Sequence, residues 1–120
     1  MVSFSSIGSP PIESILLNDE IAKDLGFSID VETDNDATIL NLSGPLEING
    51  CTAQRAGNFI TESGKDISGY LGTISQGNPP SSFGYIRNGK GLKMLVFIDY
   101  ICPDGRNSES RRYELWSTRT

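Results

Sequence analysis

Histidine is absent from this chain of 120 residues. Its absence excludes serine–histidine and cysteine–histidine nucleophiles, histidine general bases and most transition-metal sites. The glycines also lack the spacing of phosphate-binding loops. Catalysis by a carboxylate pair stays open, because pairs formed in space cannot be recognised in a sequence. We therefore predict a non-enzymatic protein with no catalytic residue, no cofactor and no metal site.

Long apolar runs are missing as well, since no segment approaches the roughly 18 residues that a membrane-spanning helix needs. We predict no membrane partner. Residues 1–11 have neither the basic start nor the apolar stretch of a signal peptide, and we expect them to form a flexible polar leader. Residues 12–120 are expected to form a single β-rich domain, which is long enough to bury a core.

Positive charge is scarce in the first half of the chain. Residues 1–50 hold nine acidic residues and one lysine, a net charge of −8, whereas residues 51–120 hold nine basic and six acidic residues, a net charge of +3. The overall charge of −5 argues against direct binding of nucleic acid through its phosphates. It favours either an ordinary solvated surface or an acidic face for a basic protein partner.

Only two cysteines are present, Cys51 and Cys102. Their separation excludes the CxxC spacing of redox and zinc motifs. We predict a disulfide, because Cys51 follows an Asn-Gly turn and Cys102 ends a long strand, so that both lie at strand ends. A disulfide would indicate an oxidising compartment, whereas two buried free thiols would favour the cytoplasm.

The segment 92–102, LKMLVFIDYIC, is apolar on both faces of a strand and predicts the centre of a β-structure. With 13 glycines and 6 prolines for turns, the chain is expected to be mainly β. The predicted fold is an antiparallel β-sandwich or barrel with one short N-terminal helix. That helix is expected within 11–25 and ends at Gly26. It either begins at a cap formed by Asn18 or Asp19, or begins earlier, directly after Pro11.

Alternating apolar and polar residues predict a hairpin of 27–33 with 37–43, joined by the turn residues 34–36. Asn88-Gly89 is typical of a tight hairpin turn. We therefore predict that the C-terminal third is a three-stranded meander. Further short strands are expected between these two units. The meander strands are 83–87, 92–102 and 111–117, and the further strands are 46–48, 58–62 and 67–75.

An acidic series recurs at every second residue: Asp30, Glu32, Asp34 and Asp36. The series fails the calcium-loop pattern of an EF-hand, because Asn35 stands where glycine is needed and Asn41 where glutamate is needed. It is either a solvated strand face or a contact surface for a basic partner. Asp99, inside the central strand, is expected to pair with Arg111 or Arg112, because a buried carboxylate must be paired or neutral.

These observations predict a small protein-binding module that blocks a partner, as secreted or periplasmic inhibitors and immunity proteins do. Its partner would be another protein of basic charge. Two alternatives remain: a cytoplasmic acidic decoy of a nucleic-acid-binding protein, and an assembly or adhesin subunit. The sequence does not indicate whether the protein is a monomer or an oligomer. The expected contact residues are the acidic series together with Asn78 and Arg106, which lie in the polar loops 76–82 and 103–110.

Overall fold

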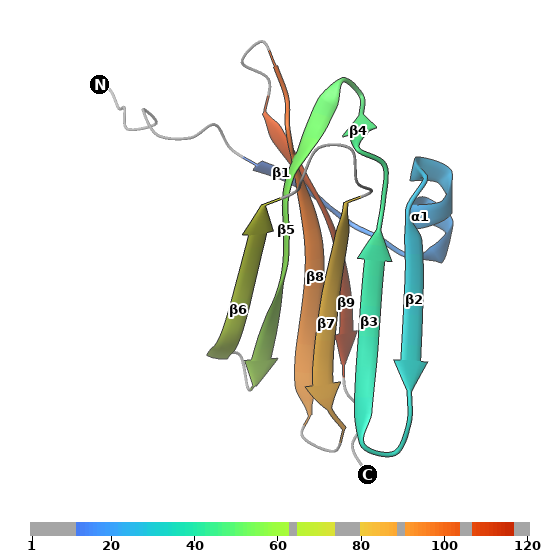
Figure 1. The fold of residues 1–120 in the computed structure, drawn as a ribbon, viewed down its shortest axis with the longest axis vertical. Coiled ribbons are helices and arrows are strands. Elements are labelled where there is room, and N and C mark those ends of the chain that lie inside the picture. Colours follow the sequence, from blue (N-terminus) through green and yellow to red (C-terminus); the bar gives the residue numbers. More distant parts are fainter. Residues whose placement is uncertain (1–11, 63–64, 74–79, 89–90, 104–106, 117–120) are drawn as a thin grey trace, which may run out of the picture.

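The computed structural model describes residues 12–62, 65–73, 80–88, 91–103 and 107–116. Within them the chain forms two β-sheets and one short helix, so the predicted mainly β fold is confirmed (Figure 1). The sheets pack face to face as a sandwich. The expected leader, 1–11, lies outside the described residues. Among those residues, no helix is long and apolar enough to cross a membrane.

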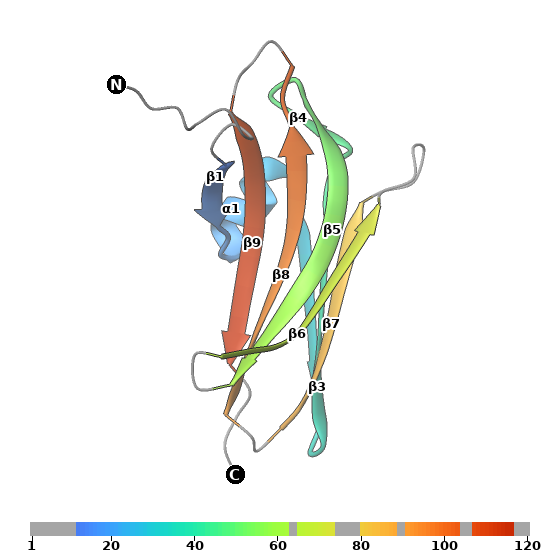
Figure 2. The same cartoon turned by 90° about the vertical axis from the view of Figure 1, so that its left-hand side faces the viewer.

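The larger sheet has six strands, in the order β1-β9-β8-β5-β4, and β6 also pairs with β5. Strand β1 runs parallel to β9, and the other neighbouring strands are antiparallel. Figure 2 shows this sheet in front, with α1 and β3 behind it. The strands are β1 (Ile12–Leu16), β4 (Glu47–Ile48), β5 (Cys51–Glu62), β6 (Lys65–Thr73), β8 (Leu92–Ile101) and β9 (Ser108–Trp116).

The smaller sheet has three strands in the order β2-β3-β7. Strands β2 (Ser28–Thr33) and β3 (Ala37–Ser43) form the hairpin that the alternating pattern predicts. Strand β7 (Ser81–Arg87) lies antiparallel to the other side of β3. The side-chain hydroxyl of Ser82 donates a hydrogen bond to the Gly57 carbonyl, and so links the free edge of β7 to β5.

Helix α1 (Asp19–Leu25) has the predicted caps. The Asn18 side chain accepts a hydrogen bond from the Ile21 N–H at 2.9 Å, and Gly26 ends the helix at φ 86°, a value that glycine adopts without strain. The expectation that the helix begins before Asn18 is wrong. Residues 12–16 form β1 instead, because their backbone groups pair with β9. Helix α1 is therefore limited to seven residues.

The hydrophobic core lies between the two sheets. Four alternate residues of β8 are fully buried, and they face the inward side of the smaller sheet and of α1: Met94, Val96, Ile98 and Tyr100. On the smaller sheet, the core is formed by Leu40 and Leu42 of β3, which are also fully buried. The prediction that β8 forms the centre of the structure is confirmed.

The predicted C-terminal meander is confirmed for its last two strands, because β8 and β9 are antiparallel neighbours, but it is wrong for its first strand. Strand β7 belongs to the smaller sheet and β8 to the larger one, so Asn88 does not begin a two-stranded hairpin turn. Asn88 instead holds the end of β7 against the β2–β3 turn: its backbone N–H donates to Asp36 O at 2.8 Å and its amide donates to Asp34 O at 2.6 Å. The pairing of β7 with β3 along its whole length places it in the smaller sheet, and the local turn signal does not reveal this long-range pairing.

Strand β5 is much longer than the predicted strand 58–62, because it begins at Cys51. Its first half contains the small residues Ala53, Ala56 and Gly57, which carry little β-strand signal in the sequence. Pairing with β8 holds this half extended, with a register shift between Ala53 and Arg55.

Candidate functional site

The acidic series lies on β2 and in the turn that follows it. Asp30 and Glu32 are exposed side chains of β2, whereas Asp34 and Asp36 belong to the turn before β3. All four are exposed. The β2–β3–β7 register places Asp30 in a row with Asn41 and Phe83, and it places Glu32 in a row with Ile39 and Tyr85. Residues in one row point to the same side of a sheet, so these side chains share its outer face.

Asp34 has a structural function in the turn. Its carboxylate accepts hydrogen bonds from the N–H groups of Asp36 at 2.8 Å and Ala37 at 2.9 Å. These two donors stabilise the ionised form and lower the pKa of Asp34. Asp34 therefore shapes the turn, and its charge adds to that of Asp36.

Two aromatic side chains project from the same outer face. Phe83 is 54% exposed and Tyr85 is 50% exposed, although both belong to a regular strand whose alternate residues are buried. We call the set Asp30, Glu32, Asp36, Phe83 and Tyr85 the acidic aromatic face. The exposure of Phe83 follows from the alternation of β7, in which every second residue is exposed, and Phe83 was not among the expected contact residues.

The acidic aromatic face ends in a small hollow of about 530 Å³ beside the β2–β3 turn. Asp36 and Tyr85 line it together with Arg87 and Asn88. The hollow joins the turn to the aromatic strand, so the acidic and aromatic parts of the face form one continuous surface.

Two predicted contact residues, Asn78 and Arg106, lie outside the described residues. Their loops connect β6 to β7 and β8 to β9.

Cys51 and Cys102 form a disulfide with an S–S distance of 2.12 Å, as the sequence predicted. The bond joins the first residue of β5 to the residue that follows β8, with the two Cα atoms 4.1 Å apart. It therefore ties two adjacent strands of the larger sheet at one end. Disulfides of this kind are typical of proteins that fold in an oxidising compartment.

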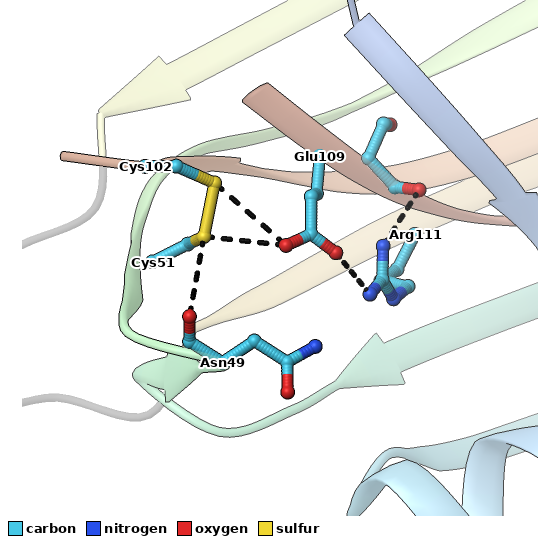
Figure 3. The surroundings of a disulfide bond; sticks show 6 residues. Asn49, Cys51, Cys102, Glu109 and Arg111 are labelled. Carbon is cyan, nitrogen blue, oxygen red and sulfur yellow. Dashed lines mark hydrogen bonds and ion pairs between the residues drawn. A yellow bond between two sulfur atoms is a disulfide. The ribbon is translucent and has the colours of Figure 1, made fainter. Parts of the chain in front are cut away.

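The disulfide lies against an ion pair between the partly exposed Glu109 and the buried Arg111 (Figure 3). The Glu109 carboxylate lies 3.2 Å from the Cys51 sulfur, and its other oxygen accepts a hydrogen bond from the Arg111 guanidinium at 2.5 Å. Arg111 is 2% exposed, so the pair balances a charge inside the protein. Donor atoms of Cys51, Cys102 and Glu109 lie within 4.8 Å of one another, but a disulfide sulfur carries no thiolate for a metal ion.

Asp99 forms an ion pair with Arg55 of β5, at 2.9 Å. The expected partners were Arg111 and Arg112 of β9, and that expectation is wrong. Asp99 and Arg55 are register neighbours on β8 and β5 and share the outward face of the sheet, whereas Arg111 points to the inward face opposite Ile98. The predicted strand 58–62 did not include Arg55, whereas β5 begins at Cys51 and does include it.

Comparisons with protein-family models, with curated proteins and with solved structures found no match.

Proposed function

We propose that this protein is a small non-enzymatic module that binds another protein through the acidic aromatic face. One observation carries the proposal: two half-exposed aromatic rings stand in rows with two exposed carboxylates on one face of a sheet. Exposed aromatic residues are enriched among the residues that dominate binding energy at protein interfaces. Tyr85 and Phe83 would enter apolar depressions of the partner.

The charge of this face favours a basic partner. Asp30, Glu32, Asp34 and Asp36 carry four negative charges around the rings, and Arg87 is the nearby basic residue that lines the hollow. Complementary charge accelerates association and disfavours acidic competitors. A basic protein with an exposed apolar depression fits both parts of the face.

Blocking the partner, as an inhibitor or immunity protein does, suits a small scaffold that is crosslinked at one end. The Cys51–Cys102 bond supports a periplasmic or secreted site of action, because disulfides persist in those compartments. The cytoplasmic decoy alternative requires reduced cysteines and is less well supported for that reason.

An assembly subunit is the second candidate. Strand β2 is an edge strand of the smaller sheet, and its Val31 side chain is 44% exposed. Such an edge can pair with another copy of the chain. The experiment below distinguishes this candidate from a heterologous partner.

Site-specific photocrosslinking tests the proposal. A photoreactive phenylalanine analogue replaces Phe83 in one variant and Phe59 in a matched control. Phe59 is also an exposed phenylalanine, at 37%, but it lies on the larger sheet. Each variant is irradiated in an extract of the cells and medium in which the protein naturally occurs.

One defined basic protein that crosslinks from position 83 and not from position 59 is the expected result. Crosslinking of the chain to itself from position 83 would replace the proposal with the assembly candidate. The same products from both positions, or no product from position 83, would contradict a binding function for this face.

A further inference from the structure

The outward face of the larger sheet contains a second hollow, of about 430 Å³, on the side away from the core. Its floor is the apolar outward side of β8 and β5, where the rings of Phe59 and Phe97 stack with centroids 5.5 Å apart and planes inclined by 17°. The volume falls within the range of small-molecule sites in proteins.

The register explains why a hollow forms there. Phe97 lies opposite Gly57 on β5 and opposite Arg112 on β9. Gly57 has no side chain, so no side chain stands beside Phe97 on the β5 side. On the β9 side, the guanidinium of Arg112 stands beside Phe97. The next outward residue of β5 is Phe59, whose ring leans on that of Phe97.

Charge in this hollow is balanced except at Arg112. Arg55 is paired with Asp99 at 2.9 Å, and Lys93 is paired with Glu114 at 3.2 Å. For Arg112, the described residues provide no ion pair, and its buried Nε–H has no hydrogen-bond acceptor. Arg112 lines the hollow, so its unpaired positive charge favours an anion there.

We propose that this hollow binds a small organic anion in which a carboxylate is attached to a planar apolar body. The carboxylate accepts hydrogen bonds from the Arg112 guanidinium, whose planar shape matches two carboxylate oxygens. The planar body stacks on the exposed side of Phe59. This site is separate from the acidic aromatic face, which lies on the other sheet.

The test is a titration with 2-naphthoate, followed by the NMR signal of the Arg112 Nε–H group. 2-Naphthamide, which has the same ring system and no charge, is the matched ligand control. We expect saturable shifts of the Arg112 signal with 2-naphthoate and about ten-fold weaker binding of the amide.

Two variants locate the site, and a third serves as a control. Arg112→Gln should weaken 2-naphthoate binding about ten-fold, and Phe59→Ala, at a partly exposed position, should weaken it by a similar factor. Arg87→Gln removes a cation from the other sheet and should leave the affinity unchanged. If Arg112→Gln does not fold, the Phe59→Ala result decides.

Equal binding of the acid and the amide would overturn the proposal. So would 2-naphthoate binding that survives both Arg112→Gln and Phe59→Ala, or that is lost in Arg87→Gln. The absence of any saturable shift in the wild-type protein would also overturn it.

Discussion

The guanidinium of Arg111 lies 2.5 Å from the carboxylate of Glu109, and the other oxygen of that carboxylate lies 3.2 Å from the Cys51 sulfur of the Cys51–Cys102 disulfide. Arg111 is 2% exposed, and its side chain is on the inward face of β9. The buried Arg111 charge would be costly without a counter-charge, and the partly exposed Glu109 carboxylate supplies that counter-charge.

Glu109→Gln should lower the free energy of unfolding by about 3–5 kcal/mol, because it leaves a buried cation without its counter-charge. The double variant Glu109→Gln, Arg111→Met should lose much less than the sum of the two single variants. Urea unfolding of the four proteins gives this coupling. Additive losses would show that the two groups do not stabilise each other.

Removal of the disulfide should destabilise the protein strongly. The two cysteines are 51 residues apart, and closing a loop of this size is worth about 4 kcal/mol in the chain-entropy model. The variant Cys51→Ala, Cys102→Ala should lose about that amount in urea unfolding. Wild-type protein in reductant is the control and should lose a similar amount, and a loss well below this value in both would contradict the predicted contribution.

The sequence predicts the parts of the fold that depend on local signals. A few neighbouring residues are enough to predict the helix caps Asn18 and Gly26 and the β2–β3 hairpin. The same is true of β8, which is apolar on both faces. The pairing of strands that are not joined by a hairpin cannot be predicted in this way. Asn88-Gly89 is a good local turn signal, yet β7 pairs with β3, and Asn88 donates hydrogen bonds to Asp34 and Asp36, which are far away in the chain.

The same limit applies to the candidate sites. The acidic series could be recognised from its spacing, but its association with Phe83 and Tyr85 depends on the pairing of β3 with β7. Likewise, Arg55 pairs with Asp99 only because β5 extends back to Cys51. Such a relation between distant residues has no signal in a single sequence.

Stability should fall in alkaline solution because of Tyr100. This residue is fully buried, its hydroxyl donates to the Pro45 carbonyl at 2.7 Å, and burial raises its pKa, an effect that nearby Arg111 partly offsets. Neutral Tyr100 stabilises the folded protein, and this stabilisation is fully present below a pH of about 10, the pKa of tyrosine in the unfolded chain. It is lost as pH rises from that value towards the higher pKa of Tyr100 in the folded protein, by up to about 1.4 kcal/mol per pH unit.

Tyr100→Phe isolates this effect. The variant should be less stable at neutral pH by about 1 kcal/mol, because it lacks the hydrogen bond to Pro45. Its stability should decline less than that of the wild type above a pH of about 10. Urea unfolding across this range gives both quantities, and parallel declines in the two proteins would refute the assignment to Tyr100.

Gly84→Ala should destabilise the contact between the two sheets. A Cβ atom at Gly84 would overlap Met94 Sδ and would lie 3.2 Å from a methyl carbon of Val96, and both of these residues are fully buried. We expect a loss of about 1–3 kcal/mol in thermal or urea unfolding. Ser81→Ala, at an exposed position of the same strand, is the control, and equal effects of the two substitutions would contradict the tight approach of β7 to β8.

The most direct test of the proposed function is the affinity of the protein for the partner that crosslinks from position 83. Tyr85→Ala removes a half-exposed ring from the acidic aromatic face, and Trp116→Ala removes an exposed ring from the larger sheet. We predict that Tyr85→Ala raises the Kd by about 30-fold or more and that Trp116→Ala leaves it nearly unchanged. An unchanged Kd for Tyr85→Ala, or an equal loss for Trp116→Ala, would contradict binding through this face.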